Sequence, residues 1–73
     1  MSAHAVVDVL PERLRDARMG LGYTQVDLAK SCGMHGCDIS QYENGRKQPT
    51  LHSLCRLAVA LNVTTDWLLG LDS

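Results

Sequence analysis

The side chains best suited to chemistry lie between positions 35 and 47, where small polar residues adjoin two cations, Arg46 and Lys47. Ile39 and Tyr42 stand three positions apart, and this spacing predicts a short helix with both side chains on its inner face. The outer face then carries Gly36, Cys37, Ser40, Gln41 and Asn44. These outward residues have no role in a core, and the amide groups of Gln41 and Asn44 both donate and accept hydrogen bonds. That chemistry suits recognition of a polar partner.

Catalysis and metal binding have less support. No nucleophile, base and orienting group recur at a recognisable spacing, and a domain of this size is too small to enclose a sizeable cleft, so we expect no enzyme. Cys32, His35 and Cys37 are close in sequence, but Cys32 points inward, Cys37 points outward, and Cys55 would be needed as a fourth ligand. We therefore expect no metal and no cofactor. Oxidation of Cys37 stays open, because a thiol at a helix start near cations is activated.

A preceding helix and a tight turn must hold the outward residues in place. Thr24 and Asp27 have the spacing of a capping box, which marks a helix start. Leu28 and Cys32 lie one turn apart on its inner face, and Ala29 is small enough for a second helix to cross closely. Gly33 then allows the chain to reverse. Two short helices around such a turn are typical of a helix-turn-helix that reads DNA.

Three further helices complete the expected fold. Pro11 suits the first turn of a helix that runs to about Met19 or Gly20, with Leu14, Ala17 and Leu21 facing inward. Thr50 caps a helix with an apolar stripe, in which Cys55 is also expected to be buried. Thr64 caps a last short helix that Gly70 ends. The apolar stripe after Thr50 consists of Leu51, Leu54, Leu57, Ala58 and Leu61. The prediction is an all-α, compact five-helix domain over residues 11–70, with an N-terminal arm (1–10) that could be disordered and a tail (71–73).

Size and charge bound the function. With 73 residues the chain forms one small domain, and its formal net charge of −1 argues against a nucleic-acid reader unless the cations cluster. Arg46 and Lys47 do cluster after the second short helix, and Lys30 lies on the first. Asp38 adds a negative charge near this face, which is tolerable if it turns toward a lysine or arginine or toward the amino group of a cytosine. No stretch predicts a membrane span or a secretory signal, and three cysteines do not suggest a disulfide framework, so we expect a cytoplasmic location.

The chain from about residue 11 to residue 70 resembles the phage-repressor and Cro helix-turn-helix family, also called the xenobiotic-response-element type. The resemblance is carried by many positions in a fixed order, from Arg18, Thr24, Gln25, Leu28, Ala29 and Gly33 through Ile39-Ser40-Gln41-Tyr42-Glu43-Asn44-Gly45-Arg46 and Pro49 to 57–63 and 67–69. It implies a lambda-repressor-like fold whose second short helix, about His35 to Glu43, lies in the major groove of double-stranded DNA.

The resemblance also implies roles for single residues. Gln41 is the main candidate for reading bases, with Cys37, Ser40, His35 and Gly36 beside it. At Gly36 and Cys37 the family usually has longer polar side chains, so few direct contacts with bases are expected here. The candidates for phosphate contacts are Gln25, Asn44, Arg46 and Lys47.

A structural ion pair and a dimer surface are implied as well. Arg18 and Glu43 match an ion pair that links the first helix to the recognition helix. The candidates for a dimer interface are Asn62, Val63, Trp67 and Leu68. We therefore expect a bacterial or phage transcriptional regulator, a repressor that binds a palindromic operator as a homodimer. The alternative is an antitoxin or a protein-interaction module of the same fold, whose protein partner would be a toxin or RNA polymerase.

Overall fold

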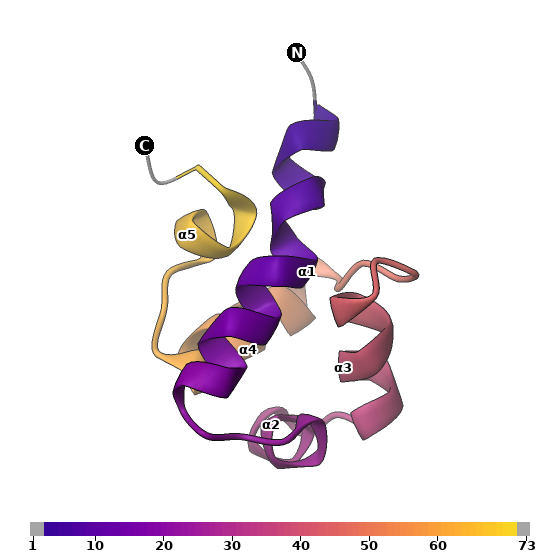
Figure 1. The fold of residues 1–73 in the computed structure, drawn as a ribbon, viewed down its shortest axis with the longest axis vertical. Helices are drawn as coiled ribbons and strands as arrows, with labels where there is room; N and C mark the ends of the chain where they lie inside the picture. The colour runs from indigo at the N-terminus through magenta and orange to yellow at the C-terminus, as the bar shows by residue number, and fades with distance from the viewer. Residues whose placement is uncertain (1–2, 72–73) are drawn as a thin grey trace.

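The structure, a computed structural model, describes residues 3–71, with side chains from Val9 onward. Within this range the chain forms helices and no strand: α1 (Ala3–Gly20), α2 (Gln25–Cys32), α3 (Gly36–Glu43), α4 (Leu51–Leu61) and α5 (Thr65–Leu69). The fold is therefore the five-helix, all-α architecture that the sequence predicts. In Figure 1 the long α1 lies beside α5, while α2 and α3 occupy the opposite end of the molecule.

One core joins all five helices. α1 packs on α3 and α5, α2 packs on α3 and α4, and α4 packs on α5. The side chains buried between them are apolar, except for the Glu43 carboxylate: Leu10, Leu14, Leu28, Ala29, Cys32, Ile39, Tyr42, Leu54, Leu57, Ala58, Leu61 and Leu68. Burial of these side chains is the main stabilising contribution, and it leaves the outer faces of the short helices free of packing duties.

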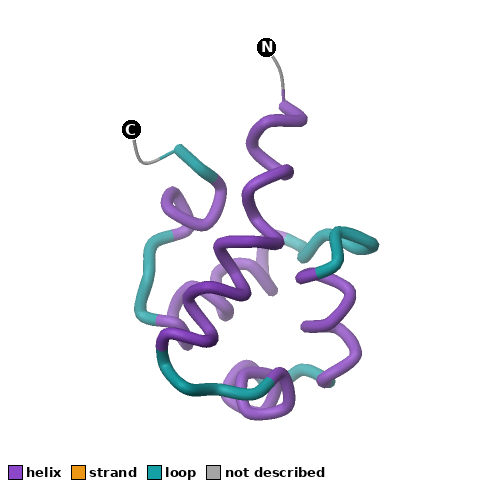
Figure 2. The backbone as a smooth tube through the Cα atoms, in the orientation of Figure 1, coloured by secondary structure: helices purple, strands orange, loops and turns teal. Residues whose placement is uncertain are grey.

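The helix ends follow the predicted chemistry. The Thr24 hydroxyl accepts a hydrogen bond from the Asp27 backbone N–H at 3.0 Å, and the Asp27 carboxylate accepts one from the Thr24 N–H at 2.9 Å, which completes the capping box of α2. Thr50 and Thr64 cap α4 and α5 in the same way through their hydroxyls. The loops that these caps terminate are teal in Figure 2.

The start of α1 differs from the prediction. The helix begins at Ala3, and Pro11 lies inside it instead of at its first turn. A proline inside a helix removes one backbone hydrogen bond, but here the residues just before it are packed. Leu10 is buried in the core, and Val9 lies so close to Gly70 that a Cβ there would stand 2.8 Å from Val9 Cγ2. These contacts with α5 extend α1 beyond its expected start.

Three expected core positions are wrong. Leu21 is 47% exposed, because α1 ends at Gly20 and the chain turns there toward α2. Leu51 is 77% exposed at the first turn of α4, and Cys55, one turn further on, is exposed on the same side. Residues spaced by four along a helix share a face. The outer stripe of α4 therefore satisfies the same spacing as the stripe that is buried.

Candidate nucleic-acid interface

α3 presents a polar face that no other part of the described chain covers. Cys37 and Gln41 are exposed, and Ser40 is half-buried. His35 is exposed and precedes the helix with an extended backbone, φ −101°, while its backbone N–H reaches the Asp38 carboxylate at 3.4 Å. The inner face is held by the buried Ile39 and Tyr42. The predicted base-reading residues thus lie along and just before one short helix.

Gly36 differs from the other residues of this set because it lies against α2. A Cβ at Gly36 would stand 3.3 Å from Val26 Cγ2 and 3.9 Å from Val26 Cα. The absence of a side chain therefore allows the start of α3 to approach α2 closely. Sequence reasoning missed this packing role, since no local signal pairs Gly36 with Val26.

The turn between α2 and α3 orients the two helices. Gly33 has φ 71° and ψ 33°, the left-handed conformation that glycine adopts without strain. The Met34 N–H then donates to the Ala29 carbonyl at 2.8 Å, which satisfies one of the free carbonyls at the end of α2. With Ala29 buried at the crossing point, the turn sets α3 close against α2.

Asp38 and Lys47 form an ion pair on the α3 face. The Lys47 Nζ lies 3.0 Å from Asp38 Oδ1 and 5.7 Å from the centre of the Tyr42 ring. The hydrogen bond from Lys47 is the main reason why the pKa of Asp38 lies below its ordinary value. The pKa of Lys47 is raised by the same contact. The negative charge of Asp38 is thus offset locally, and one of the candidate phosphate-binding cations is engaged.

Arg18, Glu43 and Gln25 form a network behind the interface. Arg18 Nε donates to Glu43 Oε2 at 2.6 Å, and Arg18 Nη2 donates to Glu43 Oε1 at 3.1 Å. Arg18 Nη1 donates to the Tyr23 carbonyl at 2.7 Å. The amide nitrogen of Gln25 also donates to Glu43 Oε1, at 3.2 Å. The Glu43 side chain is only 3% exposed, so the pair is a partly buried link between α1 and α3.

The remaining phosphate candidates lie in and just before the loop after α3. Asn44, Arg46 and Lys47 are all exposed. The Asn44 amide donates to the Ser40 hydroxyl at 3.4 Å, and the Arg46 backbone N–H donates to the Gln41 carbonyl at 3.0 Å. The loop is thereby held beside the end of α3.

The dimer candidates do not form one exposed set. Asn62 is exposed and ends α4 in the left-handed conformation, φ 58°, while Val63 is half-buried. Trp67 is half-buried with the Arg13 guanidinium 5.1 Å from its ring centre. Leu68 is fully buried in the core, so it offers no surface to a second copy.

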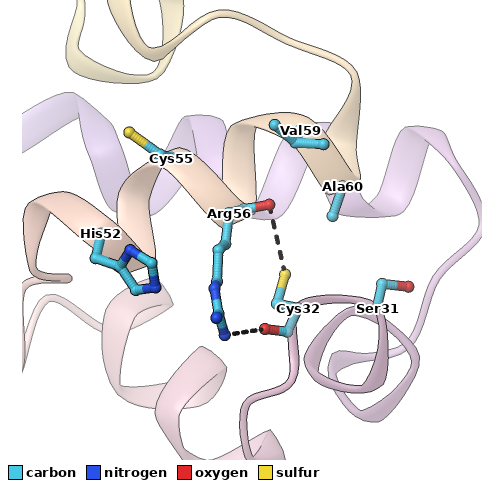
Figure 3. Close-up of a pocket in the computed structure, with 7 residues that line it drawn as sticks. All are labelled: Ser31, Cys32, His52, Cys55, Arg56, Val59 and Ala60. Atoms are coloured by element: carbon cyan, nitrogen blue, oxygen red, sulfur yellow. Dashed lines mark hydrogen bonds between the residues drawn. The ribbon is translucent and has the colours of Figure 1, made fainter.

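A groove lies between the end of α2 and α4, away from the outward face of α3. It has a volume of about 410 Å³ and is lined by Ser31, Cys32, His52, Cys55, Arg56, Val59 and Ala60. In Figure 3 the Arg56 side chain crosses it to the Cys32 carbonyl, a hydrogen bond of 3.3 Å, and the Cys32 thiol donates to the Arg56 carbonyl at 3.8 Å. Burial raises the pKa of Cys32, as expected for a thiol with a packing role.

Neither a metal site nor a membrane-spanning helix is found among the residues whose side chains are described. No three His, Cys, Asp or Glu residues there are grouped closely enough to hold a metal ion. The same residues include no helix that is long and apolar enough to cross a membrane.

The fold and the α2–turn–α3 geometry define a compact all-helical domain built around a helix-turn-helix. Residues 14–68 match the family model described as Helix-turn-helix. The chain therefore belongs to this helix-turn-helix family, of the phage-repressor type that the sequence resembles.

Individual relatives agree with the family. The chain is 38% identical over 63 residues to the HTH-type transcriptional regulator ImmR of Bacillus subtilis (strain 168). The aligned region covers 86% of this chain and 50% of ImmR. It is 33% identical over 61 residues to the cryptic phage CTXphi transcriptional repressor RstR of Vibrio cholerae. That alignment covers 84% of this chain and 54% of RstR. The chain thus spans about half the length of the curated relatives it matches.

A solved structure has the same fold. The P22 c2 repressor, crystallised with the synthetic operator 9T in the presence of Tl+, superposes with a TM-score of 0.83 at 34% identity. The superposition covers 88% of this chain and 97% of that one. The comparison is therefore between whole domains and extends well beyond the two helices of the motif.

Proposed function

We propose that this chain binds double-stranded DNA in a sequence-specific manner and regulates transcription. The observation that carries the proposal is its likeness, over 88% of its length, to a repressor that was crystallised on an operator. The uncovered polar face of α3 supports it independently, because an exposed helix with hydrogen-bonding side chains fits the major groove.

Gln41 is the main base-reading residue in this proposal. It is exposed on α3, and its amide both donates and accepts, which matches the N6 and N7 edge of adenine. The same face offers three further side chains for contacts with bases, those of Cys37, Ser40 and His35. Gly36 has no side chain with which to contact a base, and it lies against Val26 of α2. Its contribution to base reading is limited to letting the backbone of α3 come close to the DNA.

The backbone of the DNA is held by a second set of groups. Arg46 and Asn44 lie exposed in the loop region after α3, and Lys47 joins them to the extent that Asp38 releases it. Gln25 is the first residue of α2, where the positive end of the helix favours an anion. These contacts position the domain and add a salt-dependent contribution to affinity.

The full proposal is a homodimeric repressor that acts by occluding a palindromic operator with half-sites about one helical turn apart. The candidates for a symmetric contact are the exposed Asn62 and the half-buried Val63 and Trp67. A regulator of this kind works in the bacterial cytoplasm, on host or phage DNA.

The test is a selection of bound duplexes from a random DNA pool under reducing conditions at two salt concentrations. We expect enrichment of a palindrome that survives the higher salt. Gln41→Ala should then relax the preference at one position of each half-site by roughly 1–3 kcal/mol, while Gln48→Ala, a matched change in the following loop, leaves the preference unchanged. No enrichment by the folded protein would reject the proposal in favour of an antitoxin or protein-interaction module.

A further inference from the structure

We propose that Glu43 is a positioning residue for DNA binding, which holds the Gln25 amide in the orientation that binds a backbone phosphate. This inference rests on the proposed function and deepens it. One carboxylate at the end of α3 contacts both α1, through Arg18, and the start of α2, through Gln25. The contact with Gln25 therefore links a phosphate-binding group to the recognition helix.

The chemistry of the contact determines which way the Gln25 amide faces. A carboxylate only accepts hydrogen bonds, so Gln25 meets Glu43 through its amide nitrogen, at 3.2 Å from Oε1. One hydrogen of that nitrogen is engaged, and the second remains available as a donor. The donor belongs to the first residue of α2, and an anion is favoured at this end of a helix.

Loss of this constraint would present the wrong atom to DNA. A glutamine amide that turns over exchanges its nitrogen for a carbonyl oxygen, which repels a phosphate. Arg18 cannot replace Glu43 in this role, because a guanidinium has only donors. The orientation of Gln25 thus depends on Glu43.

Glu43→Gln keeps the shape of the side chain, although it also removes the charge that pairs with Arg18. The shortest contact is the 2.6 Å hydrogen bond from Arg18 Nε to Oε2, so the remaining oxygen of Gln at position 43 is expected to face Arg18. Its NH2 group then takes the place of Oε1, so the hydrogen bond from Arg18 Nη2 is lost and the Gln25 amide must turn over to offer an acceptor. A phosphate contact would be lost while the packing volume stays the same.

The experiment measures the affinity of folded variants for a random-sequence DNA duplex at low salt, with the folded fraction determined by circular dichroism under the same conditions. A duplex of random sequence suffices, because phosphate contacts do not depend on the bases. We expect Gln25→Ala and Glu43→Gln each to weaken binding about tenfold, the size of one hydrogen bond to a charged group. The double variant should be no weaker than either single variant. Arg46→Ala is the control, since its factor should multiply with that of Glu43→Gln.

The proposal is overturned if folded Glu43→Gln binds as tightly as the parent. It is also overturned if the factors of Glu43→Gln and Gln25→Ala multiply, because in both cases Glu43 has no positioning role. If the parent chain binds no duplex, the proposed function fails as well. A second measurement needs no variant: in the parent protein, one Gln25 side-chain amide proton should resonate downfield, and the other should shift on addition of DNA. Two protons at the positions of a free amide would also contradict the proposal.

Discussion

Removal of the negative charge at Asp38 should strengthen DNA binding. Lys47 donates to Asp38 at 3.0 Å, and its side chain is about half-exposed, so the cation is held on the protein although it borders the proposed DNA surface. Asp38→Asn keeps an acceptor for the His35 N–H but removes the charge. Lys47 is then free to neutralise a phosphate.

The expected size follows from counterion release. Each phosphate that a cation neutralises adds about −0.9 to the slope of log affinity against log salt concentration. Asp38→Asn should make the slope steeper by about that amount. Between 50 mM and 200 mM salt, a fourfold range, the variant should therefore lose about 3.5-fold more affinity than the parent, with its advantage greatest at low salt. Stability should fall slightly, because a carboxylate in the first turn of α3 favours the helix.

The assay is a salt titration of duplex binding by fluorescence anisotropy for the parent, Asp38→Asn, Lys47→Ala and the double variant. Lys47→Ala alone should change the slope little, since Lys47 is already paired. The double variant should lose the gain of Asp38→Asn. An unchanged or shallower slope for Asp38→Asn would refute the reasoning, and so would a gain that persists without Lys47.

The remaining predictions concern the ion pair, the loop and acid stability. Arg18→Ala leaves the buried Glu43 without its main partner and should cost about 3–5 kcal/mol in urea denaturation, a large part of the roughly 4–11 kcal/mol expected for 73 residues, whereas Arg15→Ala on the same helix should cost little. A variant at position 18 as stable as the parent would remove the pair as a stabilising link. Arg46→Ala should weaken binding to all duplexes alike and flatten the salt slope by about 0.9; an effect confined to one sequence would contradict a phosphate role. The pKa of Asp27 is held low mainly by the Thr24 backbone hydrogen bond, so its contribution to stability is present above about pH 4 and is lost as the pH falls through the lower folded pKa. Thermal melts from pH 5 to pH 2 should show a smaller decline for Asp27→Ala than for the parent.

Local signals were enough to predict the helices from the sequence. Thr24, Thr50 and Thr64 each cap a helix through a hydroxyl group three residues before the bonded N–H, and Gly33 and Gly70 end helices in the left-handed conformation. Such signals depend only on neighbouring residues, which is why they can be read without a structure.

Tertiary contacts could not be predicted in the same way. Pro11 resembles a helix start, but packing of Val9 and Leu10 against the rest of the domain carries α1 past it. Leu51 and Cys55 have the spacing of a core stripe but lie exposed, on the side of α4 that the described residues leave open. Periodicity identifies a face, and only the arrangement of the other helices decides whether that face is buried.

In the candidate DNA interface, too, some features could be predicted from the sequence and others depend on tertiary contacts. The composition of the α3 face followed from the inner positions of Ile39 and Tyr42, and the resemblance implied the contact between Arg18 and Glu43. The contact from Gln25 to Glu43 had no signal, because it joins two residues that are 18 positions apart through side chains that are common on surfaces. Geometry alone brings them together.

The close approach at Gly36 limits how the domain could be retargeted to a new operator. Any larger residue there presses on the Val26 side chain, since even a methyl group would stand 3.3 Å from Val26 Cγ2, and that side chain must then shift by a few tenths of an ångström. A change of specificity is therefore open at positions 37, 40 and 41, where side chains can be exchanged without moving the backbone. In a combinatorial library those three positions should be randomised and position 36 kept as glycine, so that every member keeps the close contact between the start of α3 and Val26.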